Sequence, residues 1–445
     1  MFDLSNEFQN FYDKEVRLSQ TEISNLREKK KLNIDRLKEG LIEYNNENKT
    51  NYKIIQTLEQ GSVAMSTIVK NRNIDYDIDV AIIFDKDNIE NIGPNAIQNI
   101  IIDSLKRKCI NMKKDPYSKT NCVRIEYTDG YHIDLAIYRR FKNYNNEFIY
   151  EHAGNEWRER NPYAINNWFN DEISNLGNNL RKIVRLSKMF CNSRDSWNMP
   201  GGLLQTVLCD EMFSNKSRID EIFYNTILSI KDRLKYNKDV LNPTSNNSLI
   251  LTKEHENKID NLYKRLDTYL EKLNILFDEN CTYKNACDAW YNFFNNEFWN
   301  NLQENNSNNE CEDNEVNIDN LFPIAIDNKS LKIDCRLTDS NKKMPDRILS
   351  KLLVKGEKIK IGYTLDFYIE NTNVSRPYNV YWKIKNNGSE AIRLNDLRGE
   401  IIKSKDNSEH QHIEYSNFRG NHYVECYIVK DKICVASSRI DVPIE

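Results

Sequence analysis

Hydrophobic and polar positions alternate most regularly between residues 76 and 85, and this alternation predicts a β-strand. Apolar residues at positions 80, 82 and 84 alternate with Asp77, Asp79 and Ala81. Because successive side chains of a strand point to opposite faces, the two aspartates are expected to project side by side from one face. The opposite face of the predicted strand is apolar.

A second pair of strands is predicted at residues 123–127 and 131–138. They are joined by Thr128-Asp129-Gly130, whose Asp-Gly pair is a hairpin signal. Asp134 stands in the middle of the second strand among apolar residues. A buried carboxylate without a partner is costly, so Asp134 should either pair with a basic residue or join a metal site. The aspartate pair upstream favours the metal site.

Spacings of three and four between apolar residues predict helices elsewhere in the first 300 residues. Residues 301–320 then contain eight asparagines and six acidic residues but no lysine or arginine, which predicts a flexible linker. Beyond the linker, short alternating segments separated by turn signals predict a β-sandwich. We therefore expect an α+β protein with an α/β lobe and N-terminal spine helix, a helical lobe, a linker and an all-β domain, at residues 1–165, 166–300, 301–322 and 323–445.

Composition limits the class of protein. The chain has 445 residues, 39% of them hydrophobic, and a mean hydropathy of -0.74, which describes a polar, soluble protein of more than one domain. No apolar run is long enough to span a membrane. The ten cysteines form no CxxC pair, so reduced thiols in the cytoplasm are expected. The net charge of -4 argues against a strongly basic nucleic-acid binder.

The candidate chemistry lies around the first strand. Two neighbouring carboxylates repel each other, and Mg²⁺ removes that repulsion because it prefers carboxylate oxygens together with substrate phosphates. Upstream, Gly61-Ser62 predicts a tight turn with backbone N–H groups and a hydroxyl that suit a phosphate. Arg185 and Lys188 lie on one face of a predicted helix with Arg181. That basic stripe is either an ordinary solvated face or a grip for a triphosphate.

These residues resemble the cGAS/DncV-like nucleotidyltransferases (CD-NTases), enzymes of bacterial anti-phage (CBASS) signalling with a polymerase-β-like fold. The Gly61-Ser62 turn and the strands of Asp77, Asp79 and Asp134 carry the resemblance, which extends over residues 1–300. It implies that the three aspartates are catalytic and hold two Mg²⁺ ions, with Mn²⁺ as a substitute. It also implies that Ser62 contacts nucleotide phosphate and that Lys188 binds the triphosphate.

One position departs from that family. A serine often follows the proline that corresponds to Pro200, and here the residue is Gly201. The hydroxyl contact to phosphate is therefore absent, and no role is carried over to this position. Asp75 precedes the core motif and is left unassigned.

The last third of the chain resembles the adenylyl/guanylyl cyclase and SMODS C-terminal sensor domain. Segments 377–382, 386–391, 397–400 and 420–426 carry this resemblance. It implies a ligand or regulator at the C-terminal domain, whose identity does not follow from the residues.

Three functions remain open from sequence. The resemblance implies an enzyme that joins ATP, GTP or other nucleoside triphosphates into a cyclic di- or trinucleotide messenger, which a downstream effector receives in antiviral defence. The aspartates by themselves imply only metal-dependent nucleotidyl transfer, so the acceptor can also be a protein, an RNA or a small molecule. The third alternative is an inactive sensor or binding module. The complete set of three acids argues against the third alternative.

Overall fold

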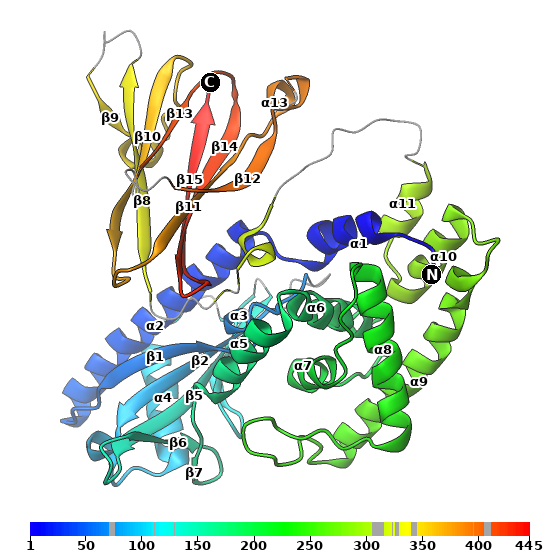
Figure 1. The fold of residues 1–445 in the computed structure, drawn as a ribbon. Helices are drawn as coiled ribbons and strands as arrows, with labels where there is room; N and C mark the ends of the chain where they lie inside the picture. Colours follow the sequence, from blue (N-terminus) through cyan, green and yellow to red (C-terminus); the bar gives the residue numbers. More distant parts are fainter. Residues whose placement is uncertain are drawn as a thin grey trace. The chain divides into compact units, whose positions relative to one another are not determined.

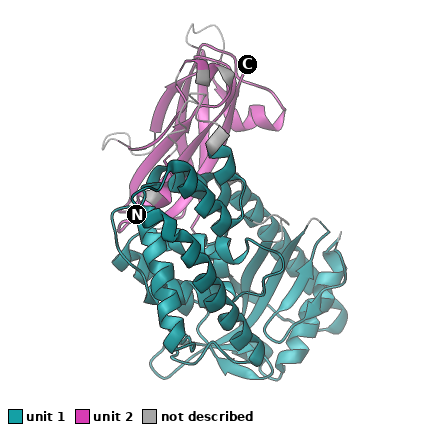
Figure 2. Cartoon of the chain, turned by 90° about the vertical axis from the view of Figure 1, so that its right-hand side faces the viewer, with its two compact units in different colours: residues 1–306 teal, residues 307–445 magenta. Residues whose placement is uncertain are grey.

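The computed structural model describes residues 1–70, 76–110, 112–128, 130–304, 316–322, 324, 329–339, 345–394, 396–404 and 411–445. The chain divides into two compact units, residues 1–306 and 307–445 (Figure 2). The division falls within the predicted linker, of which residues 305–315 lie outside the described residues, as do Asp75 and Asp129.

A mixed β-sheet forms the first lobe of unit 1 (Figure 1). Its central pair is β2 (Tyr76–Asp85) and β5 (Tyr131–Lys142), which run parallel. All its other strand pairs within the described residues are antiparallel. The remaining strands of this sheet are β1 (Ile54–Gln60), β3 (Tyr117–Ser118), β4 (Val123–Glu126), β6 (Phe148–Ala153) and β7 (Trp157–Glu159).

Two helices, α2 (Gln20–Asn48) and α4 (Pro94–Lys108), pack against one face of this sheet. The strand side chains that face them are apolar, among them Val80, Ile82 and Phe84 of β2. Ser19 begins α2 with a capping box, because its hydroxyl accepts from the Glu22 N–H while the Glu22 carboxylate accepts from the Ser19 N–H. The apolar half of the β2 alternation thus forms the core, and its aspartates face the other way.

The second lobe of unit 1 is helical and has an aromatic core. Phe8, Trp290, Phe294 and Trp299 are buried there, with ring centroids between 4.5 and 6.4 Å apart. Phe8 belongs to the N-terminal helix, so the first residues of the chain pack in the helical lobe rather than on the sheet. The helices are α1 (Ser5–Phe11), a π-helical turn (Tyr12–Val16), α5 (Ala164–Leu176), α6 (Asn179–Cys191), α7 (Gly202–Glu211), α8 (Ile219–Tyr236), α9 (Lys253–Lys272), α10 (Tyr283–Phe294) and α11 (Phe298–Glu304).

Unit 2 is a sandwich of two antiparallel sheets, ordered β13-β10-β8-β9 and β12-β11-β14-β15 in the described residues. Its core lies between the sheets, with Phe367 from one sheet and Trp382 from the other. The elements are β8 (Leu331–Asp339), β9 (Arg347–Ile348), α12 (Leu349–Val354), β10 (Tyr363–Thr372), β11 (Asn379–Lys385), α13 (Ser389–Arg393), β12 (Arg398–Lys403), β13 (Gln411–Tyr415), β14 (Gly420–Lys430) and β15 (Ile433–Ile444).

The predicted α+β class, with a mixed sheet, a helical lobe and a C-terminal all-β unit, is therefore confirmed. In the described part of the chain, every cysteine is a free thiol. Within the same residues, no helix combines the length and the apolar character that crossing a membrane requires.

Candidate active site

The three predicted acids share one face of the sheet. Asp79 of β2 lies directly opposite Asp134 of β5 in the parallel register, and Asp77 lies opposite His132. Side chains at paired positions of neighbouring strands project from the same face. The register therefore brings together residues that are more than 50 positions apart in the sequence, on the face that α2 and α4 leave open.

Arg124 joins two of these acids, and sequence reasoning missed it. It lies opposite Asp134 on β4. Its Nε donates to Asp134 Oδ1 at 2.6 Å, and its Nη2 donates to Asp134 Oδ2 at 2.7 Å and to Asp77 Oδ1 at 3.0 Å. Asp134 thus has the basic partner that was one of its two predicted alternatives. The signal was present, because residues 123–126 alternate as a strand and place Arg124 on the acidic face.

The Gly61 turn packs directly against Asp79. Gly61 has a φ of 65°, and a Cβ built on it would lie 1.9 Å from Asp79 Oδ2. Only glycine meets both conditions, because it adopts positive φ without strain and leaves space for the carboxylate. Ser62 follows in the short helix α3 (Gly61–Ala64), and its carbonyl accepts from the Thr67 N–H at 2.8 Å. The predicted glycine–serine turn and the predicted acid therefore lie in contact.

Burial and charge shift the pKa of Asp79. Burial, together with repulsion from Asp77 and Asp134, raises the pKa of Asp79 to about 6, against the opposing effect of Arg124 and Lys188. The three carboxylates are therefore close enough to repel one another, and Arg124 opposes the rise in the pKa of Asp79. A site with this excess of negative charge suits a cation.

Lys188 reaches the same turn from the helical lobe. It lies on α6, is 7% exposed, and its Nζ donates to the Thr67 carbonyl at 3.1 Å and to Thr67 Oγ1 at 2.9 Å. Burial, and then the positive charge of Arg185, lowers the pKa of Lys188 to about 7. A Cβ on Gly202, where α7 begins, would lie 3.2 Å from Nζ. Lys188 therefore lies between the turn after Gly61 and the start of α7.

The other cations of the basic stripe are buried as well. Arg181 is 1% exposed and Arg185 is 2% exposed, so the alternative of an ordinary solvated face is wrong. Arg181 Nε donates to the Met65 carbonyl at 3.1 Å. The structure places Arg185 against the hydroxyl of Tyr12, to which its Nη1 donates. The stripe therefore ties α6 to residues 65–67 and to the N-terminal segment.

The carboxylate oxygens of Asp77, Asp79 and Asp134 are the donors that a hard divalent cation prefers. Within the described residues, however, no three or more His, Cys, Asp or Glu side chains are grouped tightly enough to ligate a metal ion as they stand. One guanidinium, that of Arg124, engages both oxygens of Asp134 and one of Asp77. The donor set fits a divalent cation provided that Arg124 gives up these contacts.

Two family models match the chain. Residues 55–138 match the cyclic GMP-AMP synthase DncV-like nucleotidyltransferase domain, which includes all three acids and the Gly61 turn. Residues 312–445 match the Adenylyl/Guanylyl and SMODS C-terminal sensor domain. The resemblance found in the sequence is thereby confirmed for these two segments, one of the DncV-like nucleotidyltransferase type and one of the sensor type.

Individual relatives agree with these matches. A cyclic GMP-AMP synthase of Escherichia albertii is 23% identical over 405 residues, covering 86% of this chain and 83% of the relative. A c-di-GMP synthase of Roseivirga ehrenbergii is 25% identical over 208 residues, covering 41% of this chain and 55% of the relative. The cyclic AMP-GMP synthase DncV of Vibrio cholerae, solved with nonhydrolyzable GTP, has the same fold, with a TM-score of 0.54 at 15% identity over 67% of this chain and 97% of that one.

The contact between Gly61 and Asp79 generates a prediction. Gly61→Ala should place a methyl group where the Asp79 carboxylate lies and should strain the backbone by about 1–2 kcal/mol. We expect a modest fall in melting temperature and a fall in nucleotidyl transfer of at least tenfold, beyond what the loss of folded protein explains. Melting curves and rates of nucleotidyl transfer, measured on the purified variant and on the parent protein, test this prediction.

Gly177 provides the matched control. Its φ is 90°, but the space around its missing Cβ is open. Gly177→Ala should therefore cost stability through backbone strain but leave the rate of the folded protein unchanged. Equal losses of rate in both variants would mean that contact with Asp79 is not what Gly61 provides.

Proposed function

We propose that this protein is a Mg²⁺-dependent cyclic oligonucleotide synthase, which joins ATP and other nucleoside triphosphates into a cyclic di- or trinucleotide second messenger. The observation that carries the proposal is the convergence of Asp77, Asp79 and Asp134 on one sheet face beside the Gly61 turn. Cyclic dinucleotide synthases among the relatives support the cyclic product.

The reaction requires one sugar hydroxyl oxygen to form a bond with the α-phosphorus of a triphosphate. The bond from that phosphorus to pyrophosphate breaks, and the hydroxyl proton must be accepted. Each further nucleotide adds by the same transfer, and the last transfer, within the linear product, closes the ring and releases its own pyrophosphate. The proposal therefore needs groups that hold a triphosphate, groups that orient the hydroxyl, and a compensating charge for the leaving pyrophosphate.

We assign these tasks to the residues of the site. Asp77, Asp79 and Asp134 would hold two Mg²⁺ ions, or Mn²⁺, which supply charge neutralisation and polarise the reacting oxygens. Gly61 and Ser62 would place backbone N–H groups and a hydroxyl beside the phosphates. Lys188 would balance phosphate charge, because it already lies at the end of the same turn. Arg185 would bind the nucleotide by adding positive charge beside Lys188, while its Nη1 donates to the Tyr12 hydroxyl.

The family resemblance also supports a proposal about the cellular role of the reaction. We place the reaction in the cytoplasm, in antiviral (CBASS) defence, with the product passing to a downstream effector. The same resemblance supports a ligand or regulator at the C-terminal domain.

Product analysis tests the proposal directly. Labelled nucleoside triphosphates with Mg²⁺ should give a phosphatase-resistant cyclic product on thin-layer separation, and Asp77→Ala or Asp79→Ala should reduce it by a factor of about 10² or more. The double variant should be no worse than either single one, because ligands that act as a unit are not additive.

Asp85→Ala is the matched control for these variants. Asp85 lies on the same strand but pairs with Arg140 at 3.0 Å, so its loss should leave product formation intact. A labelled protein or RNA in place of a cyclic product would establish a different acceptor. No product from any triphosphate would overturn the assignment of a cyclic oligonucleotide synthase.

Arg124 generates a prediction about metal binding. Because its guanidinium donates to oxygens of Asp77 and Asp134, it must compete with a divalent cation for them. Arg124→Gln should therefore melt at a lower temperature than the parent protein in EDTA, since the carboxylates repel one another. Added Mn²⁺ should raise its melting temperature more than it raises that of the parent.

Arg140→Gln is the control, because Arg140 lies in the same sheet and pairs with the single carboxylate of Asp85. Its response to Mn²⁺ should equal that of the parent protein. An equal Mn²⁺ response in the Arg124 variant would show that Arg124 and the cation do not share oxygens.

Lys188 generates a third prediction. Lys188→Met keeps the length of the side chain but removes its charge, so KM for ATP should rise roughly tenfold, which corresponds to about 1.4 kcal/mol of uniform binding. Lys182→Met on the same helix, where the Nζ group donates to Gln9 Oε1 at 3.0 Å, should leave KM unchanged. A lower melting temperature with an unchanged KM would reduce Lys188 to a structural role.

A further inference from the structure

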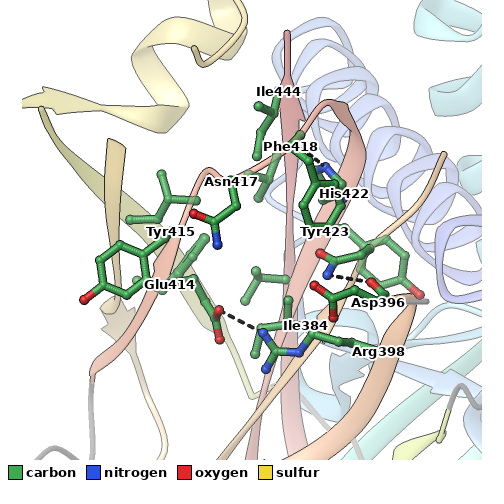
Figure 3. Close-up of a pocket in the computed structure, with 15 residues that line it drawn as sticks. Ile384, Asp396, Arg398, Glu414, Tyr415, Asn417, Phe418, His422, Tyr423 and Ile444 are labelled. Atoms are coloured by element: carbon green, nitrogen blue, oxygen red, sulfur yellow. Dashed lines mark hydrogen bonds and ion pairs between the residues drawn. The ribbon is translucent and has the colours of Figure 1, made fainter. Parts of the chain in front are cut away.

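The sandwich of unit 2 contains a pocket between the edges of its two sheets (Figure 3). The cavity has a volume of about 70 Å³. This is several times the ~10–15 Å³ that one water molecule requires. Residues of β10, β11, β12, β13, β14 and β15 line it, together with residues of the connecting loops. The pocket is thus built from both sheets of one compact unit.

The pocket has an apolar floor and a polar mouth. Leu365, Phe367, Ile384, Val424, Val442 and Ile444 form the floor. Figure 3 shows Asn417, Glu414, Arg398 and Asp396 around the opening. Such a division, in which a small number of polar groups surround an apolar cavity, is typical of small-molecule sites.

Buried hydrogen bonds hold the rim in place. Ser416 is 1% exposed, and its hydroxyl accepts from the Tyr363 N–H at 2.8 Å and donates to the Lys360 carbonyl at 2.8 Å. His422 Nδ1 accepts from the Asn387 N–H at 3.2 Å, so Nε2 carries the proton and donates to the Phe418 carbonyl at 3.2 Å. The rim is therefore ordered before any ligand arrives, which lowers the entropic cost of binding.

Arg398 reaches the mouth through an unusual backbone. Its φ is 51°, and the pairing of β11 with β12 has a register shift between Lys383 and Lys385, which lies opposite Arg398. Bulges and left-handed residues of this kind redirect side chains and concentrate at functional sites. Here the guanidinium crosses to the other sheet and donates to Glu414 Oε2 at 2.8 Å.

Asp396 and Asn417 retain hydrogen-bonding capacity at the mouth of the pocket. Glu414 already uses both oxygens, since Oε1 also lies 2.7 Å from His412 Nε2. Within the described residues, the side chains of Asp396 and Asn417 make no hydrogen bond or ion pair. Because Arg398 is balanced by Glu414 and His422 is neutral, the mouth carries the uncompensated negative charge of Asp396. A phosphate would be repelled there, whereas N–H donors would be bound.

We propose that this pocket binds an uncharged or cationic flat heterocycle of the nucleobase type, with its ring against the apolar floor and its N–H donors at Asp396 and Asn417. The ring matches the floor, and an edge that both donates and accepts matches a carboxylate beside an amide. This site is separate from the nucleotidyl-transfer site and does not depend on the function proposed for it.

Adenosine and AMP form a matched pair of probes, because they differ only in the phosphate. Titration calorimetry on the full chain should show that adenosine binds, and that Asp396→Asn and Asn417→Ala each weaken its Kd on the order of tenfold. AMP should bind the pocket more weakly than adenosine does. In each titration, binding at the pocket is identified as the binding that Asp396→Asn weakens. Melting curves establish that both variants are folded.

Two controls assign the binding to the pocket. Asp431→Asn removes a carboxylate from the turn between β14 and β15, where φ is 51° and asparagine is tolerated, and should leave Kd unchanged. Asp77→Asn, at the other site, should also leave it unchanged. Absence of adenosine binding, Kd values insensitive to Asp396 and Asn417, or tighter Asp396-dependent binding of AMP would each overturn the proposal.

Discussion

Repulsion between carboxylates is the constraint around which unit 1 is arranged. The parallel register of β2 and β5 places Asp79 opposite Asp134, and that register is fixed by apolar side chains that pack against α2 and α4. A slip of one residue would turn those side chains away from the core, so the core itself enforces the proximity of the acids. Their charge must then be compensated locally, and burial together with repulsion from Asp77 and Asp134 raises the pKa of Asp79.

The two compensating cations come from different parts of the unit. Arg124 belongs to the same sheet and touches two of the acids. Lys188 comes from the helical lobe and is held by Thr67, while Arg181 holds the Met65 carbonyl nearby. The polar contacts that dock α6 on the turn are therefore the same ones that bring positive charge to the site. A substrate that contacts Lys188 would also affect the contact between the helical lobe and the turn. Substrate binding would thereby be coupled to the arrangement of the two lobes.

Local patterns predicted the fold class and the acidic face, because alternation and helical spacing are encoded over a few residues. The contact between Lys188 and Thr67 spans 121 positions, and no local pattern encodes it. The packing of Phe8 in the helical lobe is likewise a long-range choice, made by the aromatic side chains near residue 290. Strands β12 and β13 give only a weak local signal, because they are short and β12 begins with a left-handed residue, Arg398, in place of regular alternation.

The two sites differ in whether cations are available beside their carboxylates, and this difference decides what each site can bind. In unit 1, three carboxylates crowd together and cations approach them, so a divalent metal and an anionic phosphate can share the place. In unit 2, the only guanidinium that lines the described pocket, that of Arg398, is already engaged by Glu414, and Asp396 adds a further negative charge. A phosphate there would be repelled by Asp396, and the one guanidinium among the described lining residues is already paired. A ligand of the second pocket must therefore be recognised by its ring and its N–H groups, so that nucleoside triphosphates, the proposed substrates of the first site, should compete only weakly for the second.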